Sequence, residues 1–157
     1  MLSVQEALSI ISRQVQPVAP QLLDLPQAAG FYLAAPVVLD LDSPPFDRAV
    51  LDGFALRAAD TQTAAPLQII ARQDAGGSLF SGVVGPGQCV GINTGAPLPA
   101  GADAVLMVEL ARQVPQTSPT PAAVGGAIEP IRPVAPGEAV QKRGADARAG
   151  QTVLPAG

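Results

Sequence analysis

Residues 44–57 read PPFDRAVLDGFALR, and at this stretch the chain changes from helical to strand-and-turn patterning. Two prolines stiffen its first part, and Asp52-Gly53 is a common hairpin-turn signal ahead of an apolar run. Downstream, short apolar runs alternate with turns rich in glycine and proline, which is typical of a small barrel or sandwich. We expect strands at residues 53–57, 67–72, 88–93, 103–110, 127–134 and 139–142.

The segment before this stretch predicts one amphipathic helix. Ser3 and Glu6 have the spacing of a capping box, and Pro17 and Pro20 end the helical pattern. Its apolar stripe consists of Val4, Ala7, Leu8, Ile11 and Val15. We expect a further helical turn at 26–30, a strand at 33–41 and a loop at 115–126. The last seven residues are expected to form a strand leading into a turn.

Composition excludes several kinds of site. The chain has 157 residues, no histidine and a net charge of -4, so a Ser-His-Asp triad, a Cys-His dyad and a histidine-ligated metal are ruled out. Cys89 is the only cysteine, which excludes an internal disulfide and a multi-cysteine zinc site; we interpret it as a small core residue.

The same composition bears on partners. The excess of 13 acidic over 9 basic residues disfavours nucleic-acid binding. No apolar run approaches the about 20 residues that a membrane span needs. We therefore expect a cytoplasmic protein without nucleic-acid or membrane partners.

Three segments carry groups that could do chemistry. The first holds four aspartates at positions 40, 42, 47 and 52, which suit a hard divalent cation such as Mg²⁺ but are equally common turn residues. The second, 93–103, places Thr94 beside Gly95, a reasonable phosphate contact or simply a tight turn after a strand. The third, 141–150, combines Arg143, Gly144 and Asp146, which could attract an anion or form a solvated charged turn.

Taken in this order, the segments resemble the molybdopterin molybdenumtransferase family, which comprises MoeA and the related domain of gephyrin. The resemblance rests on 44–57, on the stretch TGAPLP at 94–99 followed by GADAV at 101–105, and on RGAD at 143–146 with LPAG at 154–157. It covers the whole chain but only the N-terminal portion of the family.

The resemblance implies an α+β fold that is mainly β: a small barrel-like domain inserted into a second small domain, plus the N-terminal helix. We expect the helix at 1–16, the first small domain at 17–42 and 144–157, and the inserted β-rich domain at 43–143. Family members are homodimers that insert molybdenum from molybdate into adenylylated molybdopterin with Mg²⁺ and release AMP. Their cleft is completed by a following α/β domain of the other subunit.

Carried over residue by residue, the resemblance makes Asp52, Thr94 and Asp146 the functional positions. Asp52 and Asp146 would hold the metal, and Arg143, Gly144 and Gly95 would contact the cofactor precursor. The chain departs from the family pattern where Arg48-Ala49 replaces Asn-Ser and where Ala145 replaces a glutamate.

The family's α/β domain is absent from these residues, so we expect an expressed fragment of a longer protein that is inactive alone. The alternatives are a non-catalytic dimerisation or scaffold module, a divergent paralogue without activity, and a small barrel that binds an anion through Lys142, Arg143 and Arg148.

Overall fold

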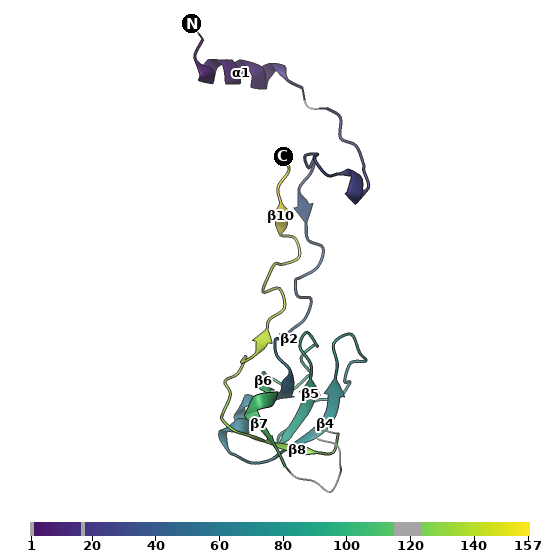
Figure 1. The fold of residues 1–157 in the computed structure, drawn as a ribbon, viewed down its shortest axis with the longest axis vertical. Coiled ribbons are helices and arrows are strands. Elements are labelled where there is room, and N and C mark those ends of the chain that lie inside the picture. Colours follow the sequence, from purple (N-terminus) through teal and green to yellow (C-terminus); the bar gives the residue numbers. More distant parts are fainter. Residues whose placement is uncertain (1, 17, 115–123) are drawn as a thin grey trace. The chain divides into compact units, whose positions relative to one another are not determined.

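The computed structural model describes residues 2–16, 18–114 and 124–157 (Figure 1). They form two compact units: unit 1 comprises Met1–Val37 with Leu154–Gly157, and unit 2 comprises Val38–Val153. The fold is mainly β with one N-terminal helix, which confirms the predicted fold class. The predicted domain boundaries at 42/43 and 143/144 stay a prediction. Among the described residues, no helix combines the length and apolarity that a membrane span requires.

Unit 1 contains the predicted helix α1 (Val4–Gln14). The Ser3 hydroxyl accepts a hydrogen bond from the Glu6 amide at 3.2 Å, and the Glu6 carboxylate accepts one from the Ser3 amide at 2.8 Å. This capping box satisfies amide groups that have no partner within the first turn. The short 3₁₀ helix η1 (Leu25–Gln27) confirms the helical turn expected at 26–30. No residue of α1 is buried.

Two short strands, β1 (Val37–Val38) and β10 (Thr152–Leu154), pair with each other as a two-stranded sheet. The strand at the end of the chain was predicted. The strand expected over 33–41 is much shorter, however, and begins directly after Pro36, which has no amide to give to a ladder.

A curled six-stranded sheet dominates unit 2 (Figure 1). Its order is β6-β3-β5-β4-β8-β7, and β4 pairs with β5 in parallel while the other neighbours are antiparallel. The strands are β3 (Gly53–Leu56), β4 (Leu67–Gln73), β5 (Gln88–Ile92), β6 (Ala104–Met107), β7 (Ala111–Gln113) and β8 (Ala127–Pro130).

The core of unit 2 lies on this sheet. All four residues of β3 are buried, and its neighbours β5 and β6 are buried almost throughout. The largest buried side chains are Leu56, Leu67, Ile69, Leu106 and Ile128. Cys89 is completely buried, which confirms it as a core residue, and this burial raises the pKa of its thiol to about 12. Such a thiol is not a nucleophile at neutral pH.

Several strand boundaries differ from the prediction. The strand expected at 103–110 splits into β6 and the 3₁₀ turn η3 (Val108–Leu110), and the chain then forms the unpredicted strand β7. The strand expected at 127–134 ends at Pro130. The 3₁₀ helix η2 (Ala58–Gln62) was not predicted either. Residues 115–123 of the expected loop lie outside the described residues.

The hairpin reading of Asp52-Gly53 is wrong. The strand before it, β2 (Arg48–Ala49), pairs with β9 (Val140–Gln141) in a separate two-stranded sheet and not with β3. Gly53 instead begins a strand between two partners, where a Cβ would overlap the carbonyl oxygen of Leu106. Close backbone approach therefore explains this glycine better than a turn does.

Candidate functional site

The register of the sheet gathers polar residues at one edge. Gly53, the first residue of β3, pairs with Ile92 and with Met107, which are the last residues of β5 and β6. The parallel strand β4 also ends there, because Gln73 is opposite Ile92. Asp52, the loop that begins at Asn93, and Asp74 therefore all leave the sheet at the same edge.

Asp52 and Thr94 are in direct contact at this edge. Asp52 Oδ1 accepts a hydrogen bond from the Thr94 amide at 2.7 Å and one from the Thr94 hydroxyl at 2.8 Å. These two bonds are the main reasons that the pKa of Asp52 is lowered, with smaller contributions from the Asn93 side chain and the charge of Arg72. The Asp52 side chain is exposed. Because its pKa is lowered, its carboxylate stays ionised at neutral pH.

The loop after β5 is held in a fixed shape beside this pair. Gly95 has a φ of 84°, which favours glycine, and its amide donates to the carbonyl of Ala49 at 2.8 Å. The Ala49 amide in turn donates to the carbonyl of Ala96 at 3.0 Å. The loop that carries Thr94 is thus attached to β2 by a reciprocal pair of backbone hydrogen bonds.

A second polar cluster joins residues 42–48 to residues 141–149. Arg143 Nε lies 2.6 Å from Asp42 Oδ2, and Lys142 Nζ lies 2.7 Å from Asp47 Oδ2. The pKa of Asp42 is lowered, first by the Ala149 amide and then by Arg143. The pKa of Asp47 is lowered, first by Lys142 and then by the Arg143 amide. Both aspartates therefore serve as structural partners of nearby cations.

Asp146 belongs to the same cluster but has a different kind of partner. Its Oδ1 accepts a hydrogen bond from the Gln141 side-chain amide at 2.8 Å, and its backbone amide donates to Ser43 at 2.9 Å. Among the described residues, no cation lies within salt-bridge distance of Asp146 or Asp52. These two carboxylates accept hydrogen bonds from uncharged donors and keep their negative charge available.

The remaining predicted positions are placed as follows. Gly144 has a φ of 69°, and its amide donates to the carbonyl of Pro44 at 2.9 Å. A Cβ there would come within 3.2 Å of Arg148 Cγ. The guanidinium of Arg143 is engaged by Asp42, as described above. Gly144 and Arg143 therefore have structural reasons for their identities, and their predicted contact with a cofactor precursor stays a prediction.

The acidic residues do not form a closed metal site within the described part of the chain. No group of three or more acidic or cysteine side chains there is close enough to hold a metal ion. The grouping of residues 40, 42, 47 and 52 that the sequence suggested is divided by the fold, since Asp52 lies at the sheet edge with Thr94 while Asp42 and Asp47 pair with cations.

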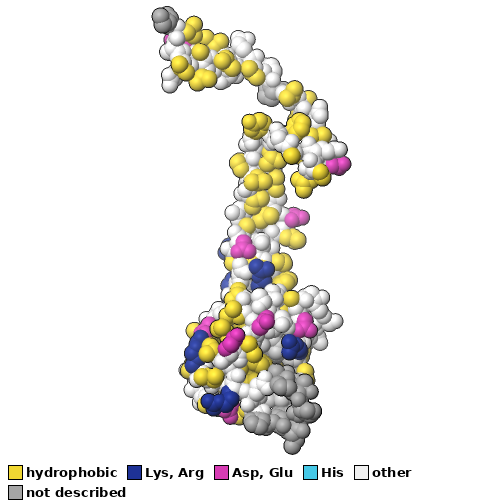
Figure 2. Space-filling view, viewed as in Figure 1, with side chains coloured by type: hydrophobic (Ala, Val, Ile, Leu, Met, Phe, Trp, Pro, Cys, Tyr) yellow, Lys and Arg dark blue, Asp and Glu magenta, His cyan; other side chains and the backbone are white. Residues whose placement is uncertain are grey.

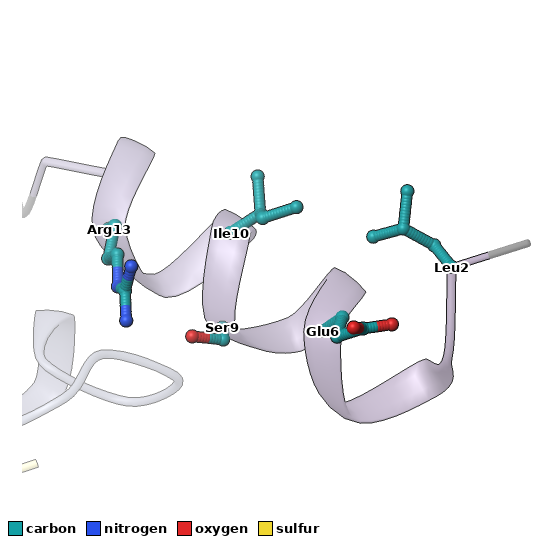
Figure 3. Close-up of a pocket in the computed structure, with 5 residues that line it drawn as sticks. All are labelled: Leu2, Glu6, Ser9, Ile10 and Arg13. Carbon is teal, nitrogen blue, oxygen red and sulfur yellow. The ribbon is translucent and has the colours of Figure 1, made fainter.

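A hollow on unit 1 does not qualify as a site. It is lined by Leu2 and by Glu6, Ser9, Ile10 and Arg13 of α1, as Figure 3 shows. Four of these residues belong to one exposed helix and Leu2 directly precedes its cap, so no second described element lines the hollow. The Glu6 carboxylate is turned back to Ser3. A ligand site normally encloses most of its ligand, which one helix face cannot do.

The surface of unit 2 carries charges of both signs. Figure 2 shows basic and acidic side chains interspersed on the visible face of this unit. A nucleic-acid-binding surface would gather its lysines and arginines on one stripe or patch. On the visible face neither sign of charge is gathered in this way.

The chain is thus a small β-rich module in which two carboxylates, Asp52 and Asp146, accept hydrogen bonds from uncharged donors and have no ion-pair partner among the described residues. Residues 2–157 match the sequence pattern of the family described as MoeA N-terminal region (domain I and II). The chain therefore belongs to this family, and the resemblance drawn from its motifs is confirmed.

Comparison with individual relatives supports this family membership. Molybdopterin molybdenumtransferase 2 of Mycobacterium tuberculosis is 32% identical over 161 residues, which cover 98% of this chain and 36% of that protein. Molybdopterin molybdenumtransferase of Bacillus subtilis is 35% identical over 130 residues, covering 80% of this chain and 29% of that protein. A crystal structure of the molybdopterin biosynthesis MoeA protein of Pyrococcus horikoshii superimposes with a TM-score of 0.78 at 30% identity, covering 98% of this chain and 38% of that one.

The chain thus spans about a third of the length of these relatives. Residues 2–157, which match the family pattern, contain the sheet edge and the polar cluster described above.

Sequence reasoning missed three residues that contact the candidate site. Arg48 donates a hydrogen bond to Gln141, and Gln141 donates one to Asp146. Arg72 Nη2 lies 3.4 Å from Oδ1 of Asn93, the residue before Thr94. Arg48 and Gln141 are 93 residues apart in the chain, so no local pattern connects them. Only the pairing of β2 with β9 reveals their contact.

Proposed function

We propose that this chain is the N-terminal portion of a molybdopterin molybdenumtransferase. In this function it contributes Asp52, Thr94 and Asp146 to a cleft that a following α/β domain completes. The substrates would be molybdate and adenylylated molybdopterin, and the products the molybdenum cofactor and AMP. The enzyme would act in the cytoplasm as a homodimer. The similarity to named transferases over nearly the whole chain supports this proposal.

One observation in the structure carries the assignment of the site. Of the four aspartates in segments 42–52 and 141–149, Asp42 and Asp47 pair with cations, whereas Asp52 and Asp146 accept hydrogen bonds from uncharged groups. A carboxylate that must bind a cation needs its charge free, since a tightly held guanidinium or ammonium would compete for the same oxygens. The two free carboxylates are those that the family resemblance assigns to the metal.

Each of these carboxylates has the chemistry of a ligand in an open magnesium site. Mg²⁺ commonly binds through one or two carboxylates, and waters and substrate phosphates complete its octahedron. Both hydrogen bonds to Asp52 use Oδ1, and the bond from Gln141 also uses Oδ1 of Asp146, so neither carboxylate spends its Oδ2 on these contacts. When bound, the metal would neutralise negative charge that builds up on phosphate and molybdate oxygens.

The chain's own residues would then act by orientation. The Thr94 amide and hydroxyl fix Asp52 and keep its pKa low, so that it presents a full negative charge at neutral pH. The reciprocal bonds between Ala49 and the loop at 95–96 keep Thr94 in place. With its excess of acidic residues, the chain by itself would repel both anionic substrates, and basic groups from the rest of the enzyme or the metal must offset this charge.

Molybdenum insertion can be compared between the isolated 157-residue chain and the complete enzyme that contains it. We expect insertion by the complete enzyme and none by the isolated chain, because the pterin-binding half of the cleft would be missing. Insertion by the isolated chain would contradict the composite cleft. A complete enzyme that binds adenylylated molybdopterin but never releases AMP would contradict the transferase function.

A non-catalytic scaffold is the second candidate, and the departures from the family pattern favour it. The structure weakens one of these arguments. Ala49 is 1% exposed and packs with Ala55, Ile92, Ala96 and Val105, so a hydroxyl at this position would face the core. Ala145, by contrast, is exposed where the resemblance leads us to expect a carboxylate. As a scaffold, the complete protein would tolerate loss of the Asp52 charge.

A further inference from the structure

The short strand β2 connects the two parts of the candidate site. On one side its backbone pairs with the loop after β5: Arg48 is bridged to Pro97, and Ala49 exchanges hydrogen bonds with Gly95 and Ala96. On the other side Arg48 is opposite Gln141 of β9. Arg48 and Ala49 of β2 therefore bind both the loop that carries Thr94 and the strand β9, which precedes Asp146 in the chain.

A relay of side-chain hydrogen bonds runs from β2 to Asp146. The Arg48 Nε–H donates to Gln141 Oε1 at 2.8 Å, and Gln141 Nε2 donates to Asp146 Oδ1 at 2.8 Å. Arginine has only donors, so the Gln141 carbonyl must face Arg48 and its amide nitrogen must face Asp146. Without Arg48, the Gln141 side chain would lose the donor that holds its Oε1, and only its bond to Asp146 would remain.

Hydrogen bonds thus hold both the backbone and the side chain of Asp146. Its backbone amide is held by the Ser43 carbonyl at 2.9 Å, and one carboxylate oxygen is held by Gln141. An exposed side chain without such contacts samples several rotamers, and ordering it on ligand binding costs free energy. The relay removes this freedom in advance and leaves Oδ2 in a defined direction.

The neighbouring cations do not disturb this arrangement. Lys142 and Arg143 directly follow Gln141 in the sequence but bind Asp47 and Asp42. Arg48 bonds to the neutral amide of Gln141, and no ion pair joins it to Asp146 among the described residues. The carboxylate is consequently oriented by a cation without being neutralised by it.

We propose that Arg48 and Gln141 are positioning residues that hold the Asp146 carboxylate ready for a cationic or metal-bridged ligand. The proposal rests on the proposed function of Asp146. It gives Arg48, which departs from the family pattern, a role in setting the orientation of the Gln141 side chain.

The geometry can be tested without any activity, by ¹⁵N nuclear magnetic resonance of side-chain amides in the 157-residue protein. We expect the Gln141 amide signals to lie away from those of exposed glutamines such as Gln68, and to move toward them in Arg48→Met. Arg48→Lys keeps a donor and should preserve most of the difference. Gln141 signals that coincide with those of exposed glutamines in the unchanged protein would overturn the relay.

The effect on function is tested by molybdenum insertion in the complete enzyme. Removing a residue that orients a metal ligand typically costs about 10- to 100-fold in activity or metal affinity. We expect Gln141→Met and Arg48→Met to lower kcat by this amount and to leave KM for adenylylated molybdopterin nearly unchanged, with Arg48→Lys restoring much of the rate. Gln68→Met, an exposed glutamine on β4, is the matched control and should have no effect.

The outcomes separate this proposal from the proposed function. If Asp146→Asn leaves insertion unchanged, the function of Asp146 is wrong and the relay has nothing to position. If Asp146→Asn lowers insertion but Gln141→Met and Arg48→Met do not, the positioning proposal alone is wrong. Thermal unfolding of each variant shows whether a lost rate reflects a lost fold.

Discussion

The sheet of unit 2 and the helix α1 of unit 1 have equally clear apolar patterns but opposite burial. Every residue of β3 is buried, while no residue of α1 is, and Leu8 and Ile11 of its stripe are 57% and 55% exposed. Figure 2 shows the hydrophobic side chains on the surface of this helix. An apolar sequence pattern therefore predicts that a helix or strand forms. How much that helix or strand stabilises the fold depends on whether its apolar side chains are buried.

The largest expected effect is on the sheet. Leu106→Ala removes a completely buried side chain of β6 from the core, and such changes typically destabilise by about 2–5 kcal/mol. Chemical denaturation of the purified protein measures this loss. Leu8→Ala in α1 is the matched change and should cost less than about 0.5 kcal/mol, because its side chain is already exposed. An equal loss of unfolding free energy in the two variants would contradict the inferred difference between the sheet and α1.

A smaller loss is expected from a buried hydroxyl next to the sheet. Thr61 is 2% exposed; its Oγ1 donates to Ala58 at 2.7 Å and accepts from the Val134 amide at 3.0 Å. Thr61→Val keeps the shape but leaves that amide without a partner, which should cost about 1–3 kcal/mol. Thr63→Val, at an exposed position two residues later, is the control for the same substitution and should leave the denaturation midpoint in place.

Acid should loosen the polar cluster before it affects the sheet. The pKa values of Asp42 and Asp47 are lowered in the folded protein, so their contributions are complete above the ordinary value of 3.8. These contributions are lost as the pH falls through the lowered folded-state values. Titration of the Asp42 carboxylate by magnetic resonance measures the shift. Arg143→Met should raise the pKa of Asp42 toward its ordinary value and leave the pKa of Asp52 unmoved.

The smallest effect on global stability is expected at the capping box. Ser3→Ala leaves the Glu6 amide without its side-chain acceptor, and an eleven-residue helix with no buried face has little else to hold it. Circular dichroism should show a loss of helical signal with no change in the midpoint of sheet unfolding. A lower midpoint would mean that α1 supports the sheet.

The elements with local signals were predictable. The buried strands β3 and β5 are apolar runs bounded by turn residues, and α1 has both its cap and its stripe in the sequence. Strand β2 was missed because Arg48 and Ala49 form no apolar pattern and pair with residues more than 90 positions away. The stretch after Met107 was misread as a continuing strand because its apolar residues carry into the turn η3.

The site shows the same division. Asp52, Thr94 and Asp146 could be named from their motifs, but not their partners. The contact between Asp52 and Thr94 depends on the register that sets Gly53 opposite Ile92, and the link from Arg48 to Asp146 depends on the pairing of β2 with β9. Which aspartates are neutralised by cations is likewise decided by non-local contacts.

The central claim is that Asp52 at the sheet edge is functional and is more than part of a turn. Molybdenum insertion by the complete enzyme carrying Asp52→Asn tests it most directly. Asp60→Asn is the matched control, because Asp60 also binds a backbone amide, that of Gly87, which lies just before β5 at the opposite edge. We predict a loss of about 100-fold or more for Asp52→Asn with unchanged thermal unfolding, and a normal rate for Asp60→Asn. An unchanged rate for Asp52→Asn would contradict the account and leave the chain a scaffold.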